Sequence, residues 1–201
     1  MTVHGTDGRA LSSRGIETRT KLIEAAEQVF GELGYHDASI VKITEAAGVG
    51  QGTFYLYFES KKEIFDELVR DLNRRIRHAM TEASAGADSR LEAELLGFGG
   101  YFDFARQHPG LYLIIRQAAF VSPELFRYHY DRVSEPYVAA LREASSRGEV
   151  GPIDPEVTAW ALMSIGEMIG MRWVVNGDGS VPDHVEAELA RIIRALLEAP
   201  K

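Results

Sequence analysis

Residues 39–63, SIVKITEAAGVGQGTFYLYFESKKE, constrain the fold more than any other stretch of the chain. Ser39 is a favourable N-cap, and Ile43 continues the apolar spacing of a short helix. Gly48 predicts the end of that helix, because glycine readily adopts the left-handed conformation that closes many helices. A second short helix then opens at residues 50–53. Two helices joined by a glycine turn of this length form a helix-turn-helix, whose second helix fits the major groove of DNA.

The second helix of this motif carries side chains suited to DNA. Gln can read a base edge, Tyr hydroxyls reach phosphate, and Thr can do either. Phe54 and Phe58 are four residues apart and are expected to face inward. Lys61, at the start of the next helix, and Arg19, near the start of the first, are expected to contact phosphate. The full set predicted to contact DNA is Arg19, Ser39, Gly50, Gln51, Gly52, Thr53, Tyr55, Tyr57 and Lys61.

Residues 17–68 resemble the DNA-binding domain of the TetR family of transcriptional regulators. The resemblance covers about a quarter of the chain. It departs from the family pattern at Gly50, where Ser or Thr often precedes the recognition helix, and at Thr44, where a small alanine is common. The matching residues are Phe30-Gly31-Glu32-Leu33-Gly34-Tyr35, Ser39, Ile43, Ala46-Ala47-Gly48-Val49, Gly52-Thr53-Phe54-Tyr55-Leu56-Tyr57-Phe58 and Lys61-Lys62-Glu63-Ile64-Phe65. The resemblance implies a two-fold dimer, and it favours a repressor over an activator.

The charge of the chain is unevenly distributed. The 201 residues carry a net charge of −8, of which residues 1–77 contribute −1 and the remainder −7. DNA binding is therefore expected to depend on local placement of a few cations, not on a basic domain. These cations are Arg14, Arg19, Lys42, Lys61 and Lys62. With no cysteine and no apolar run of about 18 residues, the sequence predicts a cytoplasmic protein without a transmembrane helix.

Helical periodicity continues through the rest of the chain, and no strand pattern interrupts it. We expect an all-α fold of about nine helices, with a three-helix DNA-binding domain followed by a helical bundle for ligand binding and dimerisation. The predicted parts are a disordered tail at 1–14, the helix-turn-helix domain at 15–59, a connecting helix at 60–82, and the effector-binding and dimerisation domain at 83–201. In the tail, Arg9 and Arg14 are either part of a solvated segment or an arm that reaches a minor groove.

The predicted bundle offers apolar and aromatic side chains for an effector pocket. The candidates are Phe98, Phe102, Tyr112, Arg116, Phe120, Trp160 and Met163, and each aromatic among them can equally be core. Arg116 interrupts the apolar run 111–121, which we expect to be buried. A buried arginine needs an anion, either Glu167 or another carboxylate, or an acidic effector. The helix at 156–175 is either central to the bundle or packs one face on a second subunit, together with the last helix, 182–198. The resemblance implies the second arrangement.

These observations favour a sequence-specific transcriptional regulator, most readily a repressor that a small, largely apolar effector releases from a palindromic operator. Its expected partners are operator DNA, that effector and a second copy of the chain. The alternative is a helical ligand-binding protein without a role on DNA. An enzyme is disfavoured, because Gly48–Gly52 lacks the spacing of a phosphate-binding loop and no strand precedes it. The six histidines lack metal-ligand spacing, so neither metal nor cofactor is expected.

Overall fold

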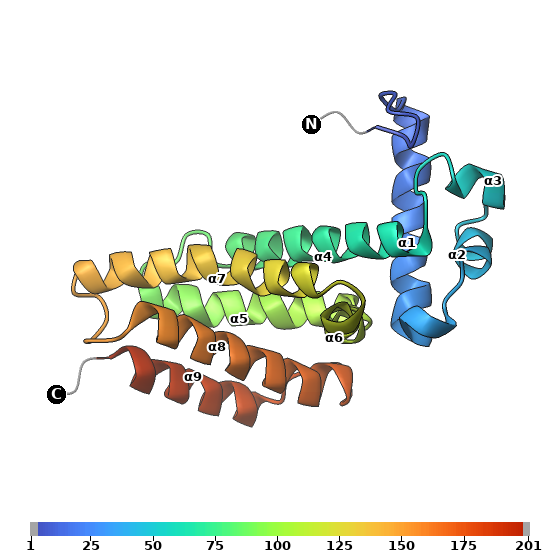
Figure 1. Cartoon of the computed structure of the whole chain (residues 1–201). Coiled ribbons are helices and arrows are strands. Elements are labelled where there is room, and N and C mark those ends of the chain that lie inside the picture. The colour runs from blue at the N-terminus through green and yellow to red at the C-terminus, as the bar shows by residue number, and fades with distance from the viewer. Residues whose placement is uncertain (1–3, 199–201) are drawn as a thin grey trace. The chain divides into compact units, whose positions relative to one another are not determined.

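The computed structural model describes residues 4–198. Within them lie nine α-helices and one π-helical segment, and the only β-type pairing is an isolated bridge between His4 and Ala10. The prediction of an all-α fold is confirmed (Figure 1). None of the helices described is long and apolar enough to cross a membrane. The elements are α1 Ser13–Asp37, α2 Ile40–Ala46, α3 Gln51–Phe54, α4 Lys61–Ala83, α5 Arg90–Gln107, α6 Leu111–Val121, α7 Pro123–Ser146, α8 Pro155–Ile169, the π-helix Gly170–Val175, and α9 Asp183–Leu197.

The chain divides into two compact units whose boundaries differ from the predicted ones. The first contains the residues up to Leu72 together with Gly110–His129, and the second contains Asn73–Pro109 and the residues from Tyr130 onward. The predicted effector domain, 83–201, is therefore not one unit, because α6 and the start of α7 fold with the DNA-binding helices. Sequence periodicity could not show this, because it identifies helices but not their neighbours.

The first unit is built from capped helices around an aromatic core. Ser39 caps α2 by accepting a hydrogen bond from the Lys42 N–H at 3.2 Å. At the other end of α2, Gly48 has φ 67°, and the Val49 N–H reaches back to the Thr44 carbonyl at 3.0 Å. This is the Schellman closure that the glycine predicted. The fully buried residues of the core include Leu22, Ala26, Phe30, Ile43, Phe54, Ile64, Phe65 and Leu68.

Helix α1 is interrupted near its C-terminal end. Gly34 itself is not helical, with φ 75°, a value that glycine adopts without steric cost. The break frees the backbone N–H of Tyr35, which donates to Oε1 of Gln117 on α6 at 2.6 Å. A partner more than eighty positions away thus allows the helix to resume after a residue that would otherwise end it.

Helix α6 packs closely on α1 but is not buried on all sides. A Cβ atom on Gly31 would lie 2.9 Å from Cα of Gly110, so the two backbones meet where neither residue has a side chain. Contrary to prediction, the run 111–121 buries one face only, because Leu113 and Phe120 remain 39% and 89% exposed. The buried residues of α6 are Leu111, Tyr112, Ile114, Ile115 and Ala118.

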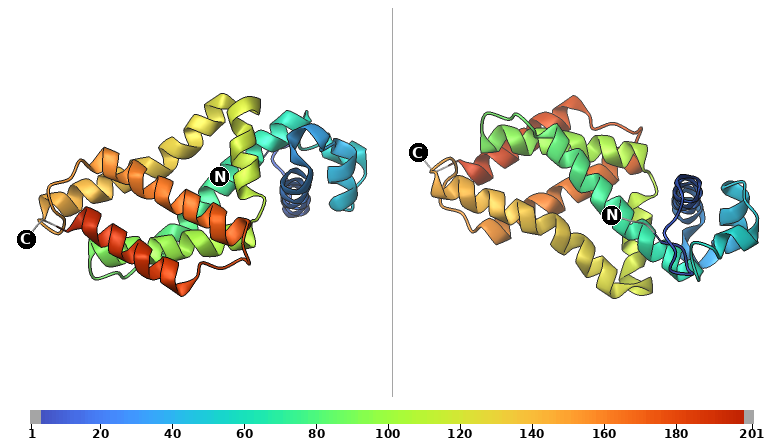
Figure 2. Two further views of the ribbon diagram at one scale, coloured as in Figure 1. Left: turned by 90° about the horizontal axis from the view of Figure 1, so that it is seen from below. Right: turned by 90° about the horizontal axis from the view of Figure 1, so that it is seen from above.

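The second unit is a bundle of the remaining helical segments, and two further views show α5, α8 and α9 lying side by side (Figure 2). Here too, glycines allow neighbouring helices to approach closely. A Cβ on Gly100 of α5 would lie 2.6 Å from Cβ of Ala83, and one on Gly166 of α8 would lie 2.9 Å from the Phe98 ring. The predicted helix 156–175 divides into α8 and the π-helix. One face of α8 stays exposed, with Val157 at 67% and Met168 at 53%.

Candidate nucleic-acid interface

Helix α3 has one side buried in the core of the first unit and one exposed polar side. Phe54 is fully buried and Phe58 is 1% exposed, as predicted, so the helix is anchored in the core of the first unit. Tyr55 is 50% exposed, and Gln51 and Gly52 are exposed beside it. Gly50, the N-cap of α3, provides no side-chain hydrogen bond to the helix.

Thr53 and Tyr57 line a hollow between the start of α1 and the start of α3. Its volume is about 400 Å³. The wall from α1 includes Arg14 and Thr18, and the wall from the motif includes Gly50. Hydroxyl, guanidinium and backbone groups therefore converge on one concave surface next to α3, which is the chemistry that binds a phosphate backbone.

Ser39 and Lys42, two of the residues expected to act in DNA binding, make contacts within the fold at the start of α2. The Ser39 hydroxyl is the acceptor that caps α2, and the ammonium of the exposed Lys42 donates to the Asp37 carbonyl at 3.0 Å. Thr44 is 2% exposed, and its hydroxyl donates to the Val41 carbonyl at 2.9 Å. Thr44 is therefore an internal polar residue and not part of the exposed surface.

The structure places Arg19 and Lys61 in intramolecular contacts. Arg19 pairs with Glu67 at 3.1 Å, and its guanidinium lies over the Phe58 ring, 5.1 Å from the centroid. The Lys61 ammonium donates to the carbonyls of Tyr35 at 2.6 Å and Ala38 at 2.9 Å. It thus neutralises the carbonyl end of α1, where a cation is favoured. Their contacts with phosphate stay predictions, and both side chains would have to leave these partners to make them.

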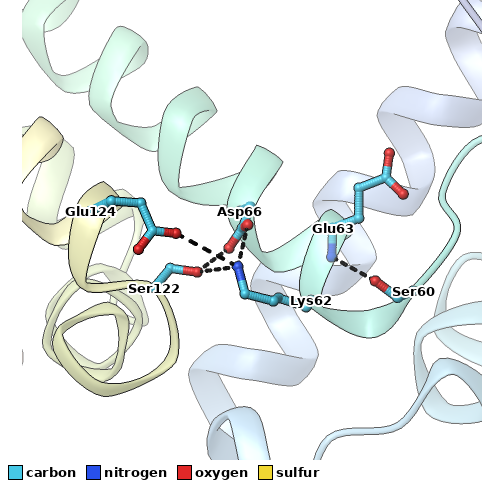
Figure 3. Close-up of polar contacts among 6 residues, drawn as sticks. All are labelled: Ser60, Lys62, Glu63, Asp66, Ser122 and Glu124. Carbon is cyan, nitrogen blue, oxygen red and sulfur yellow. Dashed lines mark hydrogen bonds and ion pairs between the residues drawn. The ribbon is translucent and has the colours of Figure 1, made fainter.

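Lys62 belongs to a polar cluster that joins α4 to the junction between α6 and α7 (Figure 3). Its ammonium donates to Asp66 Oδ2 and to Ser122 Oγ, both at 2.7 Å, and lies 3.8 Å from Glu124. The Ser122 hydroxyl in turn donates to Asp66 Oδ1. The hydrogen bond and charge of Asp66 raise the pKa of Lys62, which favours its charged form. Together with Gln117 and Gly110, this cluster fixes α6 to the DNA-binding helices at three points.

The segment before α1 is not the disordered tail that the composition predicted. Residues 4–11 form a closed turn with the His4–Ala10 bridge at its base, and Thr6 is hydrogen-bonded to the backbone of residues 55 and 56. The polar composition favoured disorder, but hydrogen bonds to the backbone of residues 55 and 56, far away in the sequence, hold this segment in place. Residues 1–3 of the predicted tail lie outside the described part of the chain.

The seven candidates for an effector pocket do not gather in one place within either unit. Tyr112, Arg116 and Phe120 lie on α6 in the first unit, whereas Phe98, Phe102, Trp160 and Met163 lie in the second. Phe98 and Phe102 are 7% and 8% exposed, with their ring centroids 6.0 Å apart. Trp160 is 40% exposed and stacks on Tyr130 at 5.9 Å.

The expectation of a buried Arg116 is wrong, because Arg116 is exposed on the open face of α6. It therefore needs no buried anion. Its expected partner Glu167 instead accepts a hydrogen bond from the Tyr130 hydroxyl at 3.0 Å. The neighbouring Phe120, at 89% exposed, is likewise not enclosed by the first unit.

A buried polar group in the second unit was missed by sequence reasoning. Glu94 of α5 is 3% exposed, pairs with Arg90 at 2.8 Å and accepts a hydrogen bond from the Tyr137 hydroxyl. Burial raises the pKa of Glu94, although Arg90 opposes that shift. The only sequence signal was the spacing of Arg90 and Glu94, which is ordinarily that of an exposed pair. Among residues 4–198, no cluster of His, Asp and Glu is arranged to hold a metal ion.

Comparison with known proteins matches the first unit most strongly. Residues 22–68 match the model of a family described as "Bacterial regulatory proteins, tetR family". An uncharacterized HTH-type transcriptional regulator of Bacillus subtilis, YdgC, is 45% identical over 67 residues, which are 33% of this chain and 34% of YdgC. This match therefore spans only about a third of that relative. The Fatty acid metabolism regulator protein of Bacillus subtilis is 26% identical over 160 residues, covering 71% of this chain and 82% of that one.

A solved structure extends the similarity of fold over most of the chain. The transcriptional regulator FadR from Bacillus subtilis, in complex with stearoyl-CoA, superposes with a TM-score of 0.76 and 22% identity. The superposition covers 87% of this chain and 96% of that one. At this level of identity the comparison establishes the arrangement of helices and not the ligand.

Proposed function

The chain belongs to the TetR family of bacterial regulatory proteins, and from this premise we propose that it binds a specific operator and represses transcription until an effector releases it. The observation that carries the proposal is the orientation of α3. Its Gln51 and Tyr55 are exposed, while its buried Phe54 anchors the helix in the core. A helix held in this way presents hydrogen-bonding groups in one orientation, as reading base edges in the major groove requires. Acting on DNA in this way implies a cytoplasmic location.

We propose that two copies act together. One helix-turn-helix reads few base pairs, whereas a two-fold pair reads a palindrome. Exposed apolar side chains on α8 and α9 support an interface there, because isolated soluble units rarely leave such a stripe uncovered. The stripe consists of Val157, Trp160 and Met168 of α8 and Leu196 of α9.

We further propose that the effector is largely apolar. The support comes from the apolar residues of the second unit and from the similarity to a Fatty acid metabolism regulator protein and to FadR, which was solved with stearoyl-CoA. Helices α4 and α7 each run from one compact unit into the other, so a shift within the second unit reaches the first along continuous helices. A ligand that binds one arrangement better than the other then changes operator affinity.

Selection of bound duplexes from a random library by the purified protein tests the proposal. We expect enrichment of a palindrome, and we expect Tyr55→Ala to lose it. If Tyr55→Ala enriches the same sequence as the wild type, α3 does not read the operator, and the proposal is contradicted. If the wild type enriches nothing, mass spectrometry of the denatured protein shows whether an effector co-purified. An effector-free protein that enriches nothing at low salt is not an operator-binding regulator.

A further inference from the structure

We infer that the turn formed by residues 4–11 is a DNA-contacting arm, which carries Arg9 to the sugar-phosphate backbone or the minor groove beside the base pairs that α3 reads. The inference rests on the proposed function and adds to it a second contact element outside the helix-turn-helix. It follows from how the turn is built, what it is fastened to, and which cations the rest of the unit leaves exposed.

The turn has its own internal hydrogen bonds. The Gly5 N–H donates to the Arg9 carbonyl at 2.9 Å, and the Gly8 N–H donates to the Gly5 carbonyl at 3.0 Å. Gly8 has φ 74°, which favours glycine. The Asp7 side chain accepts from the Arg9 N–H at 3.0 Å, an arrangement in which Asp commonly closes a turn. Arg9 therefore leaves the backbone from a defined position.

The turn is fastened to the end of the recognition helix. The Thr6 N–H donates to the Leu56 carbonyl at 3.0 Å, and the Thr6 hydroxyl donates to the Tyr55 carbonyl at 2.9 Å. A Cβ on Gly5 would lie 2.9 Å from the Leu56 carbonyl oxygen, so this approach requires glycine. Both carbonyls follow the last residue of α3 and are groups that the helix cannot satisfy itself. The arm is thus positioned by the same element that reads the bases.

The arm presents an exposed cation in addition to Arg14, which lines the hollow beside α3. The Arg9 side chain is 88% exposed, and its ion pair with Asp7 is 3.6 Å long and exposed, which makes it weak. By contrast, Arg19, Lys61 and Lys62 are engaged by groups of the protein. Binding to the phosphate backbone requires cations, and arginine suits both phosphate and a narrow minor groove. A basic side chain held beside a helix in the major groove lies next to either the phosphate backbone or the adjacent minor groove.

The test uses the full chain and the operator selected above, with affinity measured over a range of salt concentrations. Arg9→Ala is expected to weaken binding about 3- to 30-fold and to reduce the slope of log affinity against log salt by about 1. Asp7→Asn keeps an acceptor for the Arg9 N–H but removes a negative charge, so it is expected to strengthen binding. Arg147→Ala is the matched control, because Arg147 is an exposed arginine paired with Glu143 at 2.7 Å in the second unit.

A second pair of measurements identifies what Arg9 contacts and how it is positioned. The base pairs flanking each half-site are changed from A·T to G·C. If the loss caused by Arg9→Ala shrinks on the G·C flanks, Arg9 occupies the minor groove, and if it is unchanged, Arg9 contacts phosphate. Thr6→Val removes one fastening bond at nearly constant volume, and we expect its effect to be smaller in the Arg9→Ala background than alone.

The inference is overturned if Arg9→Ala and Asp7→Asn bind the operator as the wild type does, with circular dichroism confirming that both are folded. That result would leave operator binding by α3 intact, whereas a wild type that binds no DNA would refute the proposed function itself. The two failures are therefore distinguishable in one series of titrations.

Discussion

At the scale of single residues, neighbours in the recognition helix are expected to have opposite roles. Tyr55 is 50% exposed, whereas Phe54 is fully buried. We predict that Tyr55→Ala weakens operator binding about 10-fold or more, the equivalent of one good contact, and leaves stability nearly unchanged. Phe54→Ala should instead lower the free energy of unfolding by about 3–5 kcal/mol. Urea unfolding and DNA titration of both variants check this, and a destabilised Tyr55→Ala would contradict it.

Lys61 matches the DNA-binding motif of the family, but in the structure its contacts stabilise the fold. Its ammonium satisfies the carbonyls of Tyr35 and Ala38 and lies 4.4 Å from the Tyr35 ring centroid. We predict that Lys61→Met lowers the free energy of unfolding by about 1–2 kcal/mol, because carbonyls at a helix end lose their cation. Urea unfolding measures this loss.

The same variant decides whether Lys61 also contacts phosphate, as its place in the sequence predicted. A phosphate contact would reduce the salt dependence of operator affinity by about one unit of slope in Lys61→Met. An unchanged slope together with reduced stability would assign Lys61 to the fold alone. Unchanged stability would show that the carbonyl contacts contribute little.

At the scale of elements, helix starts were predictable and helix partners were not. Ser39 and Ser89 each accept a hydrogen bond from the N–H three residues on, at 3.2 Å, and local sequence marks both caps. The continuation of α1 past Gly34 depends on Gln117, and the order of residues 4–11 depends on Tyr55 and Leu56. Such long-range hydrogen bonds leave no periodic signal, so the order of residues 4–11 was predicted incorrectly.

The junction between α6 and α7 yields a prediction at this scale. Ser122 is fully buried, and its hydroxyl bridges Lys62 and Asp66. We predict that Ser122→Ala lowers the free energy of unfolding by about 1–2 kcal/mol, because the Lys62 ammonium and the Asp66 carboxylate each lose a hydrogen-bond partner. Lys62 and Asp66 still pair with each other at 2.7 Å, which limits the loss.

Ser146→Ala is the control for this junction, because the Ser146 hydroxyl is exposed and bonds only locally, to the Glu143 carbonyl. We expect it to unfold at the same urea concentration as the wild type. If α6 is part of the DNA-binding unit, as the three fastening points indicate, Ser122→Ala should also change operator affinity, and Ser146→Ala should not. Equal operator affinities of Ser122→Ala and the wild type would show that this junction is only structural.

At the scale of the whole molecule, the sequence predicted the function class better than the division of the chain. The fixed spacing around Gly48 and Phe54 identified the DNA-binding motif, because a short motif places all its constraints close together in sequence. The division into two units instead depends on contacts such as Gly31 with Gly110, between segments far apart in the chain. The effector residues were the least predictable, since aromatic residues of core and pocket share the same helical spacing.

The exposed stripe on α8 and α9 leads to a prediction about assembly. Val157 is 67% exposed and Met168 is 53% exposed. We predict that the double variant Val157→Glu, Met168→Glu is a folded monomer, because a dimer interface would bury four like charges without partners. Sedimentation equilibrium should show the wild type as a dimer and the variant at half its mass, with equal helical content by circular dichroism.

Operator binding by the same variant connects assembly to function. Two half-sites about one helical turn apart, about 34–36 Å, are read together only if the two recognition helices are joined. The monomer should therefore bind a full palindrome no better than a single half-site, whereas the wild type should prefer the palindrome strongly. Leu96→Glu is the control, because Leu96 is 41% exposed on α5, outside the stripe. A monomeric Leu96→Glu would move the interface to α5, and a double variant that stays dimeric would exclude this stripe as the surface on which the protein assembles.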